Sequence, residues 1–164
     1  MTPSPSPDTK RQLLRHAVAT LAYRGGKTLR GAPPDFSQFA ASPGTRTPGQ
    51  ILAHVCDLFD WALKMLDGAP EFHVTRPQTW EQDSARFFAA LEAFDQRLAD
   101  GNPIGFDPEH VFQGPIADAL THVGQIGMLR RMAGAPVRGE NYFKAHITAG
   151  RVGADQAAPV FEFD

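Results

Sequence analysis

The strongest structural signal in the chain lies in residues 47–66, which read TPGQILAHVCDLFDWALKML. Thr47, Pro48 and Gln50 together have the pattern of a helix capping box with proline in the first turn. The apolar residues that follow recur at helical spacing, namely Ile51, Val55, Leu58, Phe59, Ala62, Met65 and Leu66. The segment therefore predicts an amphipathic helix that begins at Pro48 and turns one apolar stripe toward a core.

Three other stretches of the chain combine helical periodicity with an absence of proline. The four proline-free windows are residues 8–32, 49–69, 78–102 and 116–135, and connectors rich in proline separate them. Proline breaks helix interiors but is tolerated in loops and in the first turn. The windows predict four helices of about 20 residues each, which close as an all-α four-helix bundle.

Local signals place the ends of these helices. Thr79 and Gln82 form a second potential capping box. Gly114-Pro115 is expected to open the fourth helix, and Gly134 is expected to close it. Residues 23–27, YRGGK, are interpreted as the end of the first helix, with anion binding as an alternative. Strand-like alternation is confined to residues 158–163.

The length of 164 residues allows one ordinary domain. Residues 1–8 include a Ser/Pro-rich segment, and we expect them to form a disordered N-terminal tail. Residues 9–134 are predicted to form the four-helix bundle. Residues 135–164 are predicted to form a C-terminal irregular extension that packs on the bundle.

The composition excludes several classes of protein. A net charge of −2 argues against a nucleic-acid binder, which usually carries a basic excess. One cysteine, Cys56, rules out a disulfide framework within the chain, and we expect it to be a small buried residue. No apolar run approaches the ~20 residues of a membrane span, and residues 1–10 lack the apolar segment of a signal peptide. We therefore expect a cytoplasmic protein.

Three residues stand out as candidates for metal chemistry. Asp118 and His122 are four residues apart, so they share one face of the fourth helix, and carboxylate and imidazole are both good ligands for divalent ions. His54 lies beside the apolar stripe of the second helix, where an ionisable group needs a partner. The plainer interpretations are a core histidine with one hydrogen bond and an exposed Asp–His pair. Gln125 lies on the same side and is a candidate outer-shell donor.

Gly124 and Gly127 lie within one turn of the fourth helix. Each glycine costs about 1 kcal/mol relative to alanine in a helix interior, so the pair needs a reason. Either the close approach of another helix or room for a ligand would supply one. Close packing is the interpretation that we favour from sequence.

The second and fourth helices together resemble a known family. Residues 51–54, ILAH, precede residues 118–125, DALTHVGQ, and the latter resemble the HxxxHxGQ signature of DinB-like proteins. That family consists of four-helix bundles that bind a divalent metal through one histidine of helix two and an HxxxH pair of helix four. The resemblance covers roughly residues 9–134. It places His54 and His122 on two ligand positions, and Asp118 where most members carry the first histidine and some carry glutamate.

The resemblance implies a divalent metal, zinc or nickel, held by His54, Asp118 and His122. It also implies hydrolysis or thiol-dependent S-transfer on a small molecule, with water or a low-molecular-weight thiol as the nucleophile, because the chain offers no independent one. Arg24, Arg130 and Tyr142 are the residues that we consider for orienting a substrate. The main alternative is a non-catalytic bundle that binds a small ligand or a partner chain without metal.

A third possibility is a helical dimerisation module, because bundles of this family often pair as homodimers. Aromatic residues of the connector and tail could then cover a neighbouring chain, namely Phe36, Phe39, Tyr142, Phe143, Phe161 and Phe163. They could equally cover their own bundle, and that is the arrangement that we expect.

Overall fold

Two capping boxes begin the helices that form one side of the molecule. In the computed structural model, which describes residues 7–163, the Thr47 hydroxyl accepts a hydrogen bond from the Gln50 backbone N–H, and the Gln50 side chain accepts one from the Thr47 N–H. Thr79 and Gln82 make the same reciprocal pair. Helices α2 (Pro48–Leu66) and α3 (Trp80–Ala99) therefore begin where their sequences predict.

The first helix is longer than its sequence suggests. Helix α1 spans Pro7–Leu29, so it includes two residues that we assigned to the N-terminal tail, while residues 1–6 of that tail lie outside the described residues. The interpretation of residues 23–27 as a helix end is wrong, because the helix continues through them. Gly25 is there for packing: a Cβ on it would come within 2.5 Å of the Phe87 ring of α3.

The fourth helix begins earlier than Gly114-Pro115. Asp107 precedes α4 (Pro108–Val111), a π-helical turn η2 (Phe112–Ile116) follows, and α5 (Ala117–Met132) continues with helical dihedral angles at both junctions. Pro115 therefore lies inside the helical segment, contrary to our expectation. A proline lacks the N–H for the usual helical bond and crowds the preceding turn, and the wider π-helical turn accommodates it. Gly134 closes the helix as predicted, with φ of 76°.

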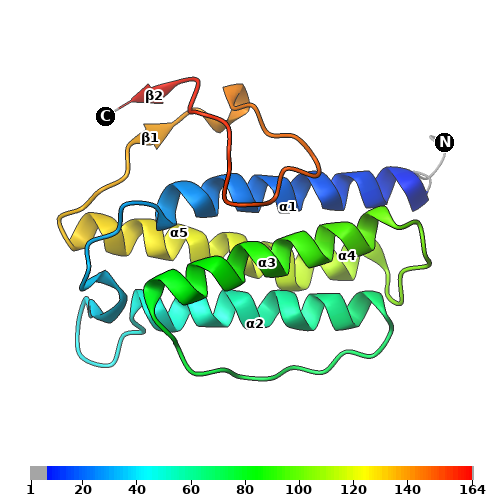
Figure 1. The fold of residues 1–164 in the computed structure, drawn as a ribbon, viewed down its shortest axis with the longest axis horizontal. Helices are drawn as coiled ribbons and strands as arrows, with labels where there is room; N and C mark the ends of the chain where they lie inside the picture. Colours follow the sequence, from blue (N-terminus) through cyan, green and yellow to red (C-terminus); the bar gives the residue numbers. More distant parts are fainter. Residues whose placement is uncertain (1–6, 164) are drawn as a thin grey trace.

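The four long helices form the all-α bundle that the sequence predicts (Figure 1). Helices α1 and α2 each pack against both α3 and α5, so they occupy diagonal positions. All four helices contribute to the core, whose largest fully buried side chains are Leu21, Leu52, Phe59, Leu66, Phe87, Leu91, Phe94, Leu98, Ile116 and Ile126. Within residues 7–163, no helix is both long enough and apolar enough to span a bilayer.

The connectors serve different purposes. The segments 30–47 and 100–107 cross the bundle diagonally, one at each end (Figure 1). The first contains a short 3₁₀ helix, η1 (Phe36–Gln38), in which Phe36 is buried, and Phe39 also packs against the core. The connector 67–79 instead runs back along α2, and this placement brings it beside the candidate site.

The C-terminal extension lies across α1 (Figure 1). It contains two strands, β1 (Gly139–Glu140) and β2 (Glu162–Phe163), paired antiparallel, with a 3₁₀ turn η3 (Tyr142–Lys144) after the first strand. Val152 is buried in the bundle core, and Glu140 reaches Tyr23 and Lys27 of α1. Our expectation that the tail aromatics are covered is wrong for Phe143, which η3 leaves 98% exposed, and for the half-exposed Phe161 and Phe163.

Candidate metal centre

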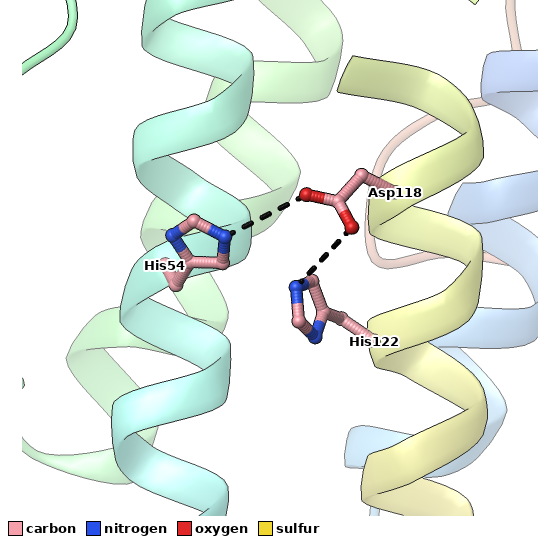
Figure 2. A group of neighbouring side chains, drawn as sticks. All are labelled: His54, Asp118 and His122. Atoms are coloured by element: carbon pink, nitrogen blue, oxygen red, sulfur yellow. Dashed lines mark ion pairs between the residues drawn. The ribbon is translucent and has the colours of Figure 1, made fainter. Parts of the chain in front are cut away.

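Helices α2 and α5 bring the three predicted ligands together. His54 points from α2 toward Asp118 and His122, which lie one turn apart on α5 (Figure 2). The Asp118 carboxylate bridges the two rings, with one oxygen 3.7 Å from His54 Nε2 and the other 3.4 Å from His122 Nε2. One ligand atom from each residue lies within 4.8 Å of the others. Residues 64 positions apart in the chain thus meet because α2 and α5 are packed neighbours.

A hydrogen bond orients the His122 ring and favours one of its tautomers. Its Nδ1 lies 2.7 Å from the Gln125 side-chain oxygen. With that oxygen as the acceptor, Nδ1 carries the proton, and the lone pair is on Nε2, which faces Asp118. Gln125 therefore contacts a candidate ligand, as its place on the helix suggests, but through an oxygen that accepts and not as the donor that we expected.

The electrostatics of the site favour a neutral His54. Partial burial lowers the pKa of His54 below its ordinary value of 6.5, and the nearby His122 and Arg46 lower it further. Asp118 and Asp57 act in the opposite direction. A neutral imidazole has a free lone pair, so His54 is ready to act as a ligand near neutral pH.

The donor set fits a divalent transition metal. Two imidazole nitrogens and one carboxylate oxygen match the ligands that zinc takes in sites with an open position. Zinc–ligand distances of about 2.0–2.1 Å place neighbouring tetrahedral ligands roughly 3.3 Å apart, close to the separations of Asp118 from the two rings. Asp118 is half-exposed, so the open side of the group faces solvent.

A cavity of about 360 Å³ adjoins the group on the side of His54. Arg46 and Gln50 line one part of it, and Phe72 and Thr75 of the connector 67–79 line another. The Phe72 ring meets His54 edge-on at 6.1 Å and Trp61 edge-on at 5.8 Å. The cavity has the size of a small-molecule site.

Buried Asp57 holds the connector in this position. Its carboxylate accepts hydrogen bonds from the Thr75 backbone N–H at 2.9 Å, from the Thr75 hydroxyl at 2.7 Å and from Arg86 at 2.7 Å. Sequence reasoning missed Arg46, Phe72 and Thr75 as site residues. The one available signal was Asp57, which lies between Cys56 and Leu58 of the second helix and requires partners if it is buried.

The residues that we considered for orienting a substrate lie elsewhere. Arg130 is buried and donates to the backbone oxygens of Thr28, Arg30 and Gly31, so it closes the C-terminal end of α1. Arg24 of α1 stacks on the Tyr142 ring of the C-terminal extension, with its guanidinium carbon 4.5 Å from the ring centroid. Neither position lines the cavity beside His54.

Cys56 is buried as predicted, and burial raises the pKa of its thiol to about 12. It therefore offers no thiolate to the site at neutral pH.

In comparisons with known proteins, no family model, no curated protein and no solved structure matches the chain.

Proposed function

We propose that this chain is a metal-dependent enzyme of the DinB-like type, which uses a divalent ion at His54, Asp118 and His122. The observation that carries the proposal is the convergence of two imidazoles and a carboxylate from two packed helices. This convergence is independent of the resemblance in sequence, which names the same three residues. Such an ion supplies a Lewis acid that polarises a substrate carbonyl or makes water or a thiol a better nucleophile.

The residues around the candidate metal site would each have a separate role in this reaction. Asp118 contributes the one negative charge of the donor set, and Gln125 keeps His122 in the tautomer that binds through Nε2. Arg46 is exposed at the rim of the adjoining cavity and has no carboxylate partner among the described residues, so it can bind an acidic group of a substrate. Phe72 supplies an apolar wall.

The nucleophile must come from outside the chain. Within the cavity, the Thr75 hydroxyl is bonded to both Asp57 and Arg86, so it is held in a structural role. The Asp57 carboxylate is likewise occupied by three donors. Water or a low-molecular-weight thiol cosubstrate fits this arrangement, and zinc or nickel fits the ligands.

Metal analysis of the full chain, purified without a histidine tag, tests the ligand assignment. We expect about one zinc or nickel per chain, and we expect His122→Ala to weaken metal affinity by more than about 100-fold. His146→Ala is the matched control, because His146 is exposed on the C-terminal extension, outside the group. Full metal occupancy in the His122→Ala variant would contradict the assignment of His122 as a metal ligand.

Thermal melts separate the enzyme from a non-catalytic bundle. A ligand that binds only the folded state raises its apparent stability, so added Zn²⁺ or Ni²⁺ should raise the Tm and a chelator should lower it. Assays of the loaded protein for hydrolysis of small esters and amides, with and without a small thiol, then test the reaction class. No shift with either metal would favour the alternative of a metal-free bundle that binds a ligand or a partner chain.

A further inference from the structure

A second cavity, of about 360 Å³, opens on the opposite flank of α5. Its walls come from α1, from α5 and from the C-terminal extension, so it exists only because the extension lies over the groove between the two helices. At about 100° per residue, Gly124, Gly127 and Arg131 lie roughly 160° around α5 from Asp118 and His122. The cavity therefore shares no residue with the metal centre.

The floor of this cavity contains Gly124 and Gly127 of α5. A Cβ on Gly124 would meet no atom within 4 Å, and a Cβ on Gly127 would make only ordinary contact with Thr28 at 3.9 Å. Close packing of another helix, the explanation that we favoured, is therefore wrong. The absence of side chains here instead keeps the space between α1 and α5 open.

Two arginines face the cavity without a carboxylate partner. Among the residues that the structure describes, neither Arg24 nor Arg131 forms an ion pair, and Arg24 is held in place by stacking on Tyr142. Glu140 also lines the cavity, but its carboxylate already accepts hydrogen bonds from the Tyr23 hydroxyl at 2.6 Å and from Lys27 at 2.7 Å. Lys27 and Arg138, which also lines the cavity, together offset the carboxylates of Glu140 and Glu162, so Arg24 and Arg131 leave the cavity with positive potential.

We propose that this cavity binds a small molecule that carries a carboxylate or phosphate group on an apolar, ring-sized body. Arg24 and Arg131 hold the oxyanion, because a guanidinium presents paired N–H donors that match two oxygens. The apolar body lies over the glycine floor, against Val123 and Phe163. The volume falls within the range of small-molecule sites.

Calorimetric titration of the full chain tests the site with defined probes. Phenyl phosphate and benzoate are the two anionic probes, and their comparison distinguishes phosphate from carboxylate as the preferred group. Benzamide has the same ring without the charge, and inorganic phosphate has the charge without the ring. We expect saturable binding of at least one anionic probe, at least about tenfold tighter than benzamide and than inorganic phosphate.

Three variants and one control variant locate the binding. Arg24→Gln and Arg131→Gln should each weaken the better probe by about tenfold or more, because each removes charge-assisted hydrogen bonds. Arg76→Gln is the matched control, since Arg76 is an exposed arginine of the connector 67–79 outside the cavity. Gly124→Leu should abolish binding by filling the cavity without changing its charge, and a Cβ at this position meets no atom within 4 Å.

The tests of this cavity can be distinguished from the tests of the metal centre. His122→Ala should leave probe binding unchanged even where it removes the metal. The proposal is overturned if Arg76→Gln weakens the probe as much as Arg24→Gln does, because binding would then reflect overall charge alone. It is also overturned if Gly124→Leu, with a native melting profile, binds as well as the original chain, or if neither anionic probe saturates.

Discussion

Replacing Glu140 tests how firmly the C-terminal extension is held on the bundle. The Glu140 side chain is 0% exposed, and its two oxygens accept hydrogen bonds from Tyr23 and Lys27. Glu140→Ala leaves the Tyr23 hydroxyl without its acceptor and deprives the Lys27 ammonium, 9% exposed, of one of its two carboxylates. Removing one partner of a buried ion pair costs about 3–5 kcal/mol.

The lower end of that range is expected here. Lys27 keeps Glu162 at 2.7 Å, so its charge is still paired in the variant. We therefore expect a loss of about 3 kcal/mol in the free energy of unfolding, most of it from the unsatisfied buried groups. With a urea m-value of about 2 kcal/mol/M, the unfolding midpoint falls by roughly 1.5 M.

Urea unfolding followed by circular dichroism measures this loss, and Glu162→Ala is the control. The Glu162 side chain is 25% exposed, and Lys27 would keep the buried Glu140, so the control should lose clearly less stability than Glu140→Ala. Tyrosinate titration gives a second readout in a Tyr142→Phe background. Burial and the hydrogen bond to Glu140 raise the pKa of Tyr23, so Glu140→Ala should lower it. Equal stability losses in the two variants would refute the reasoning.

Three further predictions concern the metal centre and its surroundings. Gln125→Ala should weaken zinc affinity by about 10- to 100-fold, because the hydrogen bond that orients His122 is lost. A competition titration with a chelating dye measures the affinity, and an unchanged value would contradict the prediction. Cys56, with a pKa raised to about 12, should resist a disulfide reagent at mildly alkaline pH in the native protein and react in urea; rapid native labelling would show that the thiol is accessible. The folded-state pKa of His54 lies below its unfolded value of 6.5, so the unfolded chain takes up this proton more readily. The metal-free protein should therefore lose stability as the pH falls through 6.5. Urea titrations at several pH values measure this loss, and His54→Gln should reduce it. An identical loss of stability in the variant would show that other groups cause it.

The helices and the pairing of Asp118 with His122 are local features, which explains why they could be predicted, whereas His54 was added by the resemblance to a known family. A capping box satisfies backbone N–H groups within one turn, so Thr47 and Thr79 mark helix starts without any information about the rest of the fold. The pairing of Asp118 with His122 follows from helical spacing alone. The π-helical turn at Pro115 was missed because proline was interpreted as a boundary, whereas here a wider turn absorbs it.

The two cavities depend on contacts between distant parts of the chain. Asp57 and Thr75 draw the connector 67–79 back along α2, and this contact places Phe72 beside His54. Glu140 and Lys27, 113 residues apart, fasten the C-terminal extension over the groove that Gly124 and Gly127 leave open. Neither contact has a local signature, because a buried carboxylate requires a partner without specifying which one.

The amino-acid sequence was sufficient to predict an all-α bundle and the pairing of Asp118 with His122, because helix formation and same-face spacing arise from interactions within a few residues. The resemblance of the second and fourth helices to DinB-like proteins added His54 to that pair. Only the tertiary structure decided that α2 and α5 are neighbours, so that His54 meets the pair on α5. It also decided that Arg130 supports α1 while Arg24 faces a separate cavity. Packing partners are chosen by the sum of many weak contacts across the whole chain, and no short segment contains that information.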